Sequence, residues 1–123
     1  MKLVIIESPY AGNWFIRRRN IKYARRAMLD SLKRGEAPFL SHLLYTQVLN
    51  DRNFEERWNG ITAGFSWGEK ADLTAVYKDY GCSGGMWAGA IDARCNSRKV
   101  EHRFIGKNSN WLRKIFEYLR MGG

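Results

Sequence analysis

The sequence predicts an α/β fold, a three-layer sandwich in which helices cover both faces of a parallel, flavodoxin- or Rossmann-like sheet of about four to five strands. Short β-type apolar runs alternate along the chain with segments of helical periodicity. Loops containing glycine or proline follow the strand segments. The 123 residues are 45% hydrophobic and 14% aromatic, enough for one folded core, so we expect a single domain over residues 1–123.

The first half of the chain is expected to begin with a strand over 2–7 and a loop over 8–12. Apolar residues at helical spacing, Ile21, Ala24, Met28 and Leu32, predict a helix that ends near Gly35. The other elements expected here are a strand over 37–44, a helical turn near 46–49 and a helix that begins after Asn53.

The second half continues the alternation. Phe54, Trp58, Ile61 and Phe65 recur at helical spacing and predict one apolar helix face. A later helix is expected to turn Met86, Ala90 and Ile91 inward. The elements predicted for this half are a strand over 71–77, a loop over 78–83, a helix over 84–94, a strand over 99–105 and a helix over 110–120.

Basic residues are concentrated near the N-terminus. The chain has 21 Lys and Arg against 12 Asp and Glu, a formal net charge of +9, and such a charge attracts anionic partners. The patch includes Arg17, Arg18, Arg19, Lys22, Arg25 and Arg26. It predicts binding of nucleic acid, another anion or an acidic protein, although a solvated helix face has the same composition.

Apolar runs and cysteines exclude several classes of protein. The apolar stretch before Glu7 has only four residues, which is too short for a signal peptide, and no run reaches the ~18 residues of a membrane span. We therefore expect a cytoplasmic protein, of a bacterial host cell if phage-encoded, without membrane contact. Cys82 and Cys95 lack zinc-site spacing, so they are interpreted as reduced thiols. The sequence predicts neither a metal nor a cofactor.

Three loops at the expected carboxyl ends of strands, 8–12, 41–45 and 78–86, are candidates for a ligand site, because parallel α/β folds bind ligands there. Glycines in the last loop let the backbone approach a ligand, and the helix start after it offers unpaired N–H groups. Asp79 has a carboxylate suited to a ribose diol or an amidine-like base edge, or to an Asx turn. These features predict a nucleoside- or nucleotide-like ligand.

Other side chains in these loops have two possible uses. Ser83 suits a ligand contact, a helix cap or both. Tyr10 and Trp87 offer faces on which a base could stack, or belong to the core. His42 is either a polar contact or a structural residue. The candidate ligand residues are Ser8, Pro9, Tyr10, His42, Asp79, Ser83, Gly84, Gly85, Met86 and Trp87.

No pattern identifies a catalytic site. The sequence has no G-x-S-x-G, Walker loop or zinc-protease helix. Gly81, Gly84 and Gly85 lack the spacing of a dinucleotide-binding loop. A nucleophile next to its base is not evident, so only weak catalytic candidates remain. They are the carboxylates of Asp92, Glu55 and Glu56.

Several motifs follow one another in a familiar order. S-P-Y-A-G follows the first strand, N-I-K-Y-A-R-R-A-M lies on the first helix, and P-F-L-S-H-L-L lies at the second strand. E-R-W-N-G-I-T-A-G precedes V-Y-K-D-Y-G-C-S-G-G-M-W-A-G-A-I-D-A and K-V-E-H-R. Over about residues 2–106 the chain resembles the nucleoside 2-deoxyribosyltransferase-like family, in particular its small members from bacteria and bacteriophages.

The resemblance implies a flavodoxin-like sheet, a ligand built from base and sugar, and, in true transferases, a glutamate that attacks the anomeric carbon. Tyr10 matches the family's first-loop aromatic residue, Asp79 its base- or sugar-contacting acid, and 83–86 its helix-start segment. The family's glutamate falls at Ala88 or Gly89 in this chain. The expected attacking carboxylate is therefore missing from that helix.

Three hypotheses follow. The first is a relative without transferase activity that binds a nucleoside- or nucleotide-type ligand as a sensor, sponge or inhibitor. The second is a deoxyribosyltransferase or N-glycosidic-bond hydrolase with a relocated carboxylate. The third is a binder of nucleic acid or protein that uses the basic patch. Relatives in the family often assemble, so we also expect a homo-oligomer, with Trp14, Phe15 and Trp67 suited to its interface.

Overall fold

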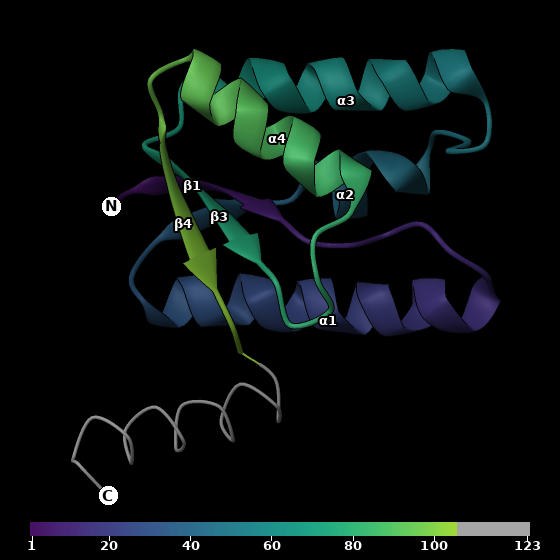
Figure 1. Cartoon of the computed structure of the whole chain (residues 1–123), viewed down its shortest axis with the longest axis horizontal. Coiled ribbons are helices and arrows are strands. Elements are labelled where there is room, and N and C mark those ends of the chain that lie inside the picture. The colour runs from purple at the N-terminus through teal and green to yellow at the C-terminus, as the bar shows by residue number, and fades with distance from the viewer. Residues whose placement is uncertain (106–123) are drawn as a thin grey trace, which may run out of the picture.

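The sheet has four strands in the part of the chain that the structure, a computed structural model, describes, residues 1–105. They are β1 (Leu3–Glu7), β2 (Ala37–Phe39), β3 (Leu73–Tyr77) and β4 (Lys99–Arg103). All pair in parallel, in the order β2-β1-β3-β4 (Figure 1). The predicted α/β class is confirmed, and the helix expected over 110–120 lies outside the described residues.

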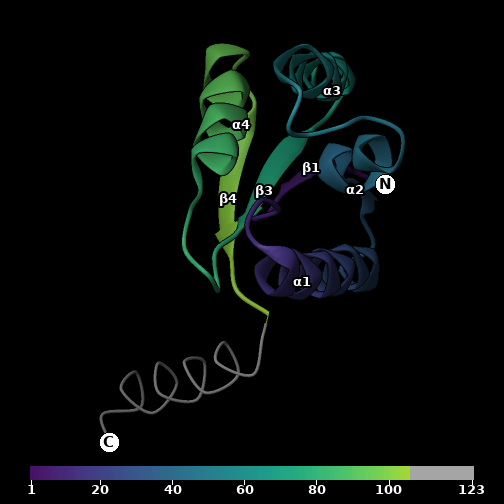
Figure 2. The ribbon, with the colours of Figure 1, turned by 90° about the vertical axis from the view of Figure 1, so that its right-hand side faces the viewer.

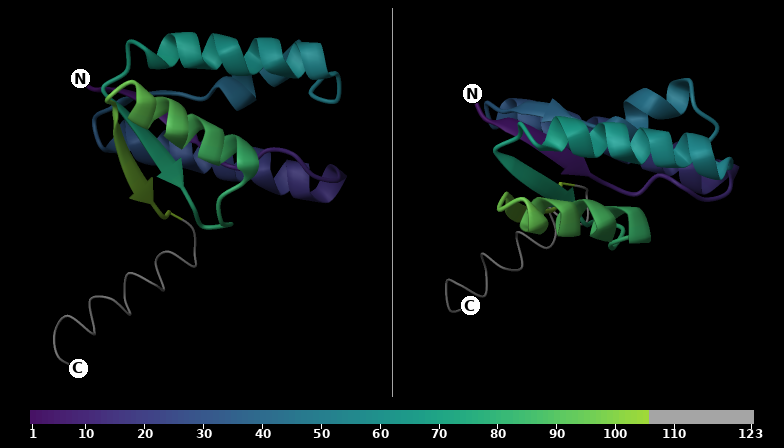
Figure 3. Two further views of the ribbon diagram at one scale, coloured as in Figure 1. Left: turned by 45° about the horizontal axis from the view of Figure 1, so that its top comes forward. Right: turned by 90° about the horizontal axis from the view of Figure 1, so that it is seen from above.

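Helices flank both faces of the sheet. Helix α1 (Trp14–Lys33) covers one face, while α3 (Phe54–Gly68) and α4 (Gly84–Cys95) lie on the opposite side (Figure 2). Viewed from above, α3 and α4 lie next to each other (Figure 3). The short helix α2 (Ser41–Leu44) and the 3₁₀ turn η1 (Tyr45–Gln47) follow β2 and pack near α3. None of the helices within residues 1–105 is long and apolar enough to span a bilayer.

The core forms on both faces because the two central strands are covered on each side. Val4 and Ile6 of β1 pack with Tyr23 of α1 in one buried cluster. Val76 of β3 and Met86 of α4 belong to a second cluster on the other face. Every residue of β3 is buried, as expected for the interior strand of a parallel sheet. The sheet therefore holds its carboxyl edge, where loops and helix starts emerge, on a rigid base.

The second predicted strand, 37–44, is wrong in its length. Strand β2 contains only three residues, and the chain then turns into α2. Pro38 has no N–H to donate, which confines it to an edge strand such as β2. The backbone N–H of Leu44 bonds the Leu40 carbonyl at 3.2 Å, so the apolar residues of this segment belong to a helical turn. His42 consequently lies on a helix.

Helix α1 is longer than the apolar spacing predicted. It begins at Trp14, because the Asn13 side chain accepts a hydrogen bond from the backbone N–H of Ile16 at 2.9 Å and caps the helix. The expected inward position of Leu32 is wrong, since its side chain is 52% exposed. Ser31 is buried instead and donates to Glu36 at 2.8 Å.

The predicted apolar face of α3 is also wrong at its start, because Phe54 is 80% exposed and Trp58 is also exposed. The helix packs through small residues instead, of which Gly64 and Gly68 are buried. A Cβ at Gly64 would lie 2.8 Å from Ser41 Oγ. Glycine therefore lets α3 approach α2 closely.

Helix α4 begins as predicted. The Ser83 hydroxyl accepts a hydrogen bond from the Met86 N–H at 3.3 Å, so its predicted role as a helix cap is confirmed. Met86 and Ala90 face inward, but Ile91 is exposed, contrary to expectation, and Ala93 is buried in the core. The small side chains of this helix allow it to lie close to the sheet.

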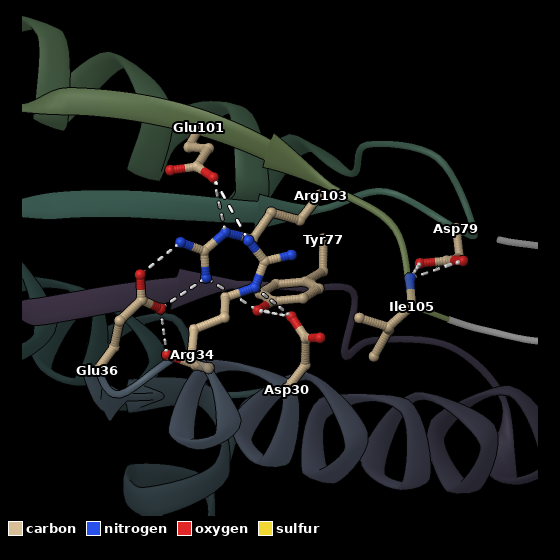
Figure 4. Close-up of polar contacts among 9 residues, drawn as sticks. Asp30, Arg34, Glu36, Tyr77, Asp79, Glu101, Arg103 and Ile105 are labelled. Carbon is tan, nitrogen blue, oxygen red and sulfur yellow. Dashed lines mark hydrogen bonds and ion pairs between the residues drawn. The ribbon is translucent and has the colours of Figure 1, made fainter. Parts of the chain in front are cut away.

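A buried ion pair joins β4 to the connection between α1 and β2 (Figure 4). The Arg103 guanidinium donates to the two carboxylate oxygens of Glu36 at 2.8 and 2.7 Å. The Tyr77 hydroxyl accepts from Arg103 at 3.1 Å and donates to Asp30 at 2.7 Å. This bidentate pair and its tyrosine link the edge strand to α1 through hydrogen bonds that are all satisfied.

Candidate functional site

A cavity of about 370 Å³ lies beside the carboxyl end of β1. Its walls come from the loop 8–11, α2, η1, α3 and the first turns of α4. The strand order reverses at β1, because the chain passes to β2 on one side and then crosses to β3 on the other. Open parallel sheets bind ligands at such a switch point. The volume also lies within the range of small-molecule sites, about 300–1,000 Å³.

Glu7, the last residue of β1, lines this cavity and packs against α4. A Cβ at Gly89 would overlap the Glu7 carboxyl group and would lie 2.8 Å from its Cγ. The backbone of α4 and the acid side chain are therefore in direct contact. A residue other than glycine at 89 would take the space that the Glu7 carboxyl occupies.

Burial controls the charge of Glu7. Loss of solvation raises the pKa of its carboxyl to about 8, the nearby Arg98 guanidinium partly opposes this, and the Asp92 carboxylate adds to it. Among the described residues, no hydrogen-bond donor or cation lies within bonding distance of its carboxyl oxygens. At neutral pH the group is mainly the neutral acid, so it can donate a proton to a molecule in the cavity.

Arg98 is buried and joins three elements behind the cavity. Its guanidinium donates to the Gly68 carbonyl at 2.6 Å and to the Thr74 hydroxyl at 2.9 Å. It also forms an ion pair with Asp92 at 2.8 Å. The other oxygen of Asp92 accepts from the Asn96 amide at 3.2 Å. Asp92 is thus held in place, with one carboxylate oxygen against a fixed positive charge.

Ser8 and His42 form a polar pair in the cavity wall. Ser8 Oγ lies 2.6 Å from His42 Nε2, and both residues line the cavity. Burial lowers the pKa of His42 to about 4, so its ring is neutral at pH 7. The segment that was predicted as a strand becomes helical at Ser41, and this turn brings His42 back to β1.

Most residues predicted for the site meet in this cavity. The lining includes Ser8, Pro9, Tyr10, His42, Ser83, Gly84, Gly85 and Met86, together with the catalytic candidates Glu56 and Asp92. Glu55, Trp87 and Asp79 are not among the lining residues. Glu55 and Trp87 are exposed on their helices.

Asp79 has a structural position that the sequence did not reveal. The Tyr23 hydroxyl donates to its carboxylate, and the backbone N–H of Asp79 donates to Tyr23 at 2.9 Å. The N–H of Ile105 also donates to the carboxylate, at 2.9 Å (Figure 4). Asp79 therefore joins the loop after β3 to α1 and to the chain beyond β4.

The cavity wall has more acidic than basic side chains, although the whole chain is basic. Four carboxyl groups and two guanidinium groups line it, although the chain carries a net charge of +9. The Arg98 guanidinium is already paired. The surroundings therefore favour a ligand with little or no negative charge. The charged lining residues are Glu7, Asp51, Glu56, Arg57, Asp92 and Arg98.

Sequence reasoning missed Glu7 and Arg98 as site residues. A signal for Glu7 existed, because an acid follows a buried apolar strand at its carboxyl end. Gly89 was a second signal, since glycine in a helix interior costs about 1 kcal/mol relative to alanine. What joins the two residues is a tertiary contact between distant segments of the chain, and no local pattern predicts it.

Comparison with known proteins agrees with the fold. The chain belongs to the family described as a domain of unknown function, DUF7768, whose model matches residues 2–103. It is similar in structure to a 2-deoxyribosyltransferase from the psychrotolerant bacterium Bacillus psychrosaccharolyticus, with a TM-score of 0.56 over 83% of this chain and 72% of that chain. Sequence identity is 15%, so this likeness concerns the fold alone. No curated protein matches the chain.

Proposed function

We propose that the cavity binds a nucleoside-type ligand and that the protein cleaves its N-glycosidic bond, with Glu7 as the general acid. The observation that carries this proposal is the position of the Glu7 carboxyl, in the cavity wall and against Gly89. Burial raises the pKa of this carboxyl to about 8, which suits a proton donor. The hypothesis of a binder without activity rested on the missing carboxylate at 88–89. Glu7 brings a carboxyl to that place from β1, which favours the hypothesis of an enzyme with a relocated acid.

The cavity lining supports a ligand made of a base and a sugar. Pro9, Tyr10 and Phe65 offer apolar surface, whereas Ser8 and Ser83 offer hydroxyl groups suited to a sugar. The carboxyl groups in the wall disfavour phosphates. A nucleoside therefore fits the charge of the cavity better than a nucleoside di- or triphosphate does.

The proposed step is a hydrolysis in which one carboxyl group acts as general acid and a second as general base. Glu7 donates its proton to the nitrogen of the leaving base as the bond between the anomeric carbon and that nitrogen breaks, and the bonding electrons stay with the base. A water oxygen then bonds to the anomeric carbon, and Asp92 accepts the proton that this water loses. Arg98 holds Asp92 in position during the step through their ion pair at 2.8 Å.

The test is release of free base from a panel of ribo- and deoxyribonucleosides, followed by chromatography. We expect Glu7→Gln to lower kcat by about 10²–10⁴-fold, the usual contribution of general acid catalysis. Thermal shifts with the same nucleosides should persist in this variant, because Gln keeps the size of the side chain. Glu55→Gln is the matched control, since Glu55 is exposed and outside the cavity.

The pH dependence gives a second measurement on the same proteins. If Glu7 is the general acid, the rate should fall as pH rises through about 8, because the acid form is then lost. Base release by Glu7→Gln at the wild-type rate would contradict the role of Glu7. A thermal shift without base release would restore the hypothesis of a sensor, sponge or inhibitor. Neither a shift nor turnover with any nucleoside would overturn the proposal as a whole.

A further inference from the structure

The outer surface of α1 carries exposed aromatic rings among basic side chains. Trp14 is 56% and Phe15 75% exposed, and their rings meet edge to face with centroids 4.9 Å apart. The Arg18 guanidinium lies 5.3 Å from the Trp14 ring centroid. These residues begin α1, at the end of the loop that lines the cavity.

An open hollow continues along the same helix. It is lined by Trp14, Arg17, Arg18, Ile21, Lys22 and Arg25. The four cations of this hollow form no ion pair within residues 1–105. Asp30, the one acid of α1, is bonded to Arg34 at 2.9 Å near the other end of the helix. The positive charge of the hollow is therefore not compensated by the described part of the chain.

The position of these charges is unfavourable for the helix itself. The first turn of α1 has no acidic residue, and Arg17, Arg18 and Arg19 follow directly. The dipole at a helix N-terminus favours negative charge, so cations at this end of α1 gain nothing from it. The stability of the helix therefore does not account for this cluster, whereas an anionic partner does.

A second stacked pair extends this surface toward the loop after β3. The Arg19 guanidinium lies 3.9 Å from the centroid of the Tyr80 ring, and Tyr80 is exposed. The surface thus alternates planar cations with aromatic rings. Bases stack on such rings, and guanidinium groups bind phosphates.

We propose that this surface of α1 binds single-stranded nucleic acid. Arg17, Arg18 and Arg25 contact successive phosphates, and Trp14 and Phe15 stack on unpaired bases. A duplex keeps its base faces covered, so it cannot use these rings. A membrane is less suited, because the exposed apolar side chains of α1 do not form one continuous face. They lie in the first turn and, at the other end of the helix, at Leu29 and Leu32. This inference does not depend on the activity proposed for the cavity.

Binding should be measured by fluorescence anisotropy with labelled oligo-dT and oligo-rU of ~15 nucleotides, as a function of salt. Arg17→Gln, Arg18→Gln and Arg25→Gln together should weaken binding about tenfold or more and reduce the slope of log K against log salt by about 2. Trp14→Ala with Phe15→Ala should weaken binding about tenfold with an unchanged slope. Circular dichroism establishes that each variant is folded.

The matched control neutralises Arg52, Lys70 and Lys99, which are exposed and lie outside α1. This control removes the same net charge as the α1 variant. An equal loss of affinity would show that binding depends only on the total charge, which would overturn the proposal. Absence of binding to either oligonucleotide would do so as well. The proposal also fails if a duplex of equal length, polyglutamate or anionic vesicles bind as tightly as the single strands.

Discussion

At the scale of single residues, the contact between Glu7 and Gly89 determines that a carboxyl group lies in the cavity wall. The carboxyl of Glu7 is placed where a side chain at position 89 would lie, and burial keeps it protonated at neutral pH. The two positions must therefore change together. A side chain at 89 and an acid at 7 exclude each other, because both need the same space.

The substitution Gly89→Ala tests this coupling. In the wild-type background we expect a loss of about 1–3 kcal/mol from overpacking against Glu7. In a Glu7→Ala background the same change should stabilise the protein by up to about 1 kcal/mol, because alanine favours the helix. Urea unfolding of the four proteins gives the coupling free energy.

Gly85→Ala is the control for this cycle, since a Cβ there meets no atom within 4 Å. It should behave alike in both backgrounds. If the effects of Glu7→Ala and Gly89→Ala are additive within about 0.5 kcal/mol, the contact does not couple the two residues.

The candidate site could be predicted in part, because some of its residues carry local signals. Ser83, Gly84 and Gly85 lie in a loop between a strand and a helix, and such loops converge at the carboxyl edge of a parallel sheet. Asp79 has the same local signal, yet its partners include Tyr23 and Ile105. A loop pattern indicates where a residue lies, but the side-chain partner depends on packing between distant segments.

At the scale of elements, Arg98 determines how α3 and α4 sit on the sheet. It joins the last turn of α3 at Gly68, strand β3 at Thr74 and helix α4 at Asp92. A Cβ at Gly68 would lie 3.1 Å from its guanidinium. The buried guanidinium of Arg98 therefore fixes the positions of α3 and α4 on the sheet. Neither helix has a strongly apolar face that would do this by itself.

Arg98→Met should destabilise the protein by about 3–5 kcal/mol, because Asp92 and the Gly68 carbonyl lose their charged partner in a buried place. Urea unfolding followed by circular dichroism measures the change. Arg94→Met is the matched control, since Arg94 is exposed on α4. If the two variants differ by less than about 1 kcal/mol, Arg98 does not have this role.

The elements were predictable where apolar spacing and a cap agree. Helix α4 follows its Ser83 cap, and β3 follows a buried apolar run. The segment 37–44 failed, because a short apolar run does not distinguish a strand from a helical turn. The exposure of Phe54 could not be foreseen either, since α3 packs through glycines, and glycines carry no apolar signal.

At the scale of the whole molecule, buried titratable groups make the stability depend on pH in two directions. The folded pKa of Glu7 is raised above 4.5, so this group favours folding at low pH and costs stability as pH rises from about 4.5 to about 8. Hydrogen bonds from Arg103 lower the pKa of Glu36, so its contribution is present above 4.5 and is lost below it. Burial lowers the pKa of His42, so this residue further reduces the stability as the pH falls from 6.5 to about 4.

The midpoint of thermal unfolding, measured from pH 3 to 9, should therefore fall at both ends. Glu7→Gln should flatten the decline between pH 5 and 8, because no proton is then lost there. Glu36→Gln should lower stability at pH 7 by about 1.5–3 kcal/mol, because Arg103 loses its bidentate acid and keeps only the longer contact with Glu101 at 3.3 Å. It should also reduce the decline below pH 4.5. A profile unchanged by Glu7→Gln would show that its carboxyl titrates normally in the folded protein.

Assembly belongs to this scale as well, and the expected homo-oligomer stays a prediction. Trp67 donates to the Tyr45 hydroxyl at 2.9 Å, while Trp14 and Phe15 belong to the surface proposed for nucleic acid. Light scattering after size exclusion gives the molar mass directly.

Because the Glu7 carboxyl comes from strand β1 and not from helix α4, sequence alignments of this chain with its relatives need care. An aligned column records which residue occupies a position, but chemistry depends on where the atoms lie. A chain with glutamate at 89 and a small residue at 7 would differ from this chain at both columns, although each would place a carboxyl group beside the same turn of α4. Relatives should therefore be sorted by the pair of positions together, because either column read alone would class such a chain as lacking its acid.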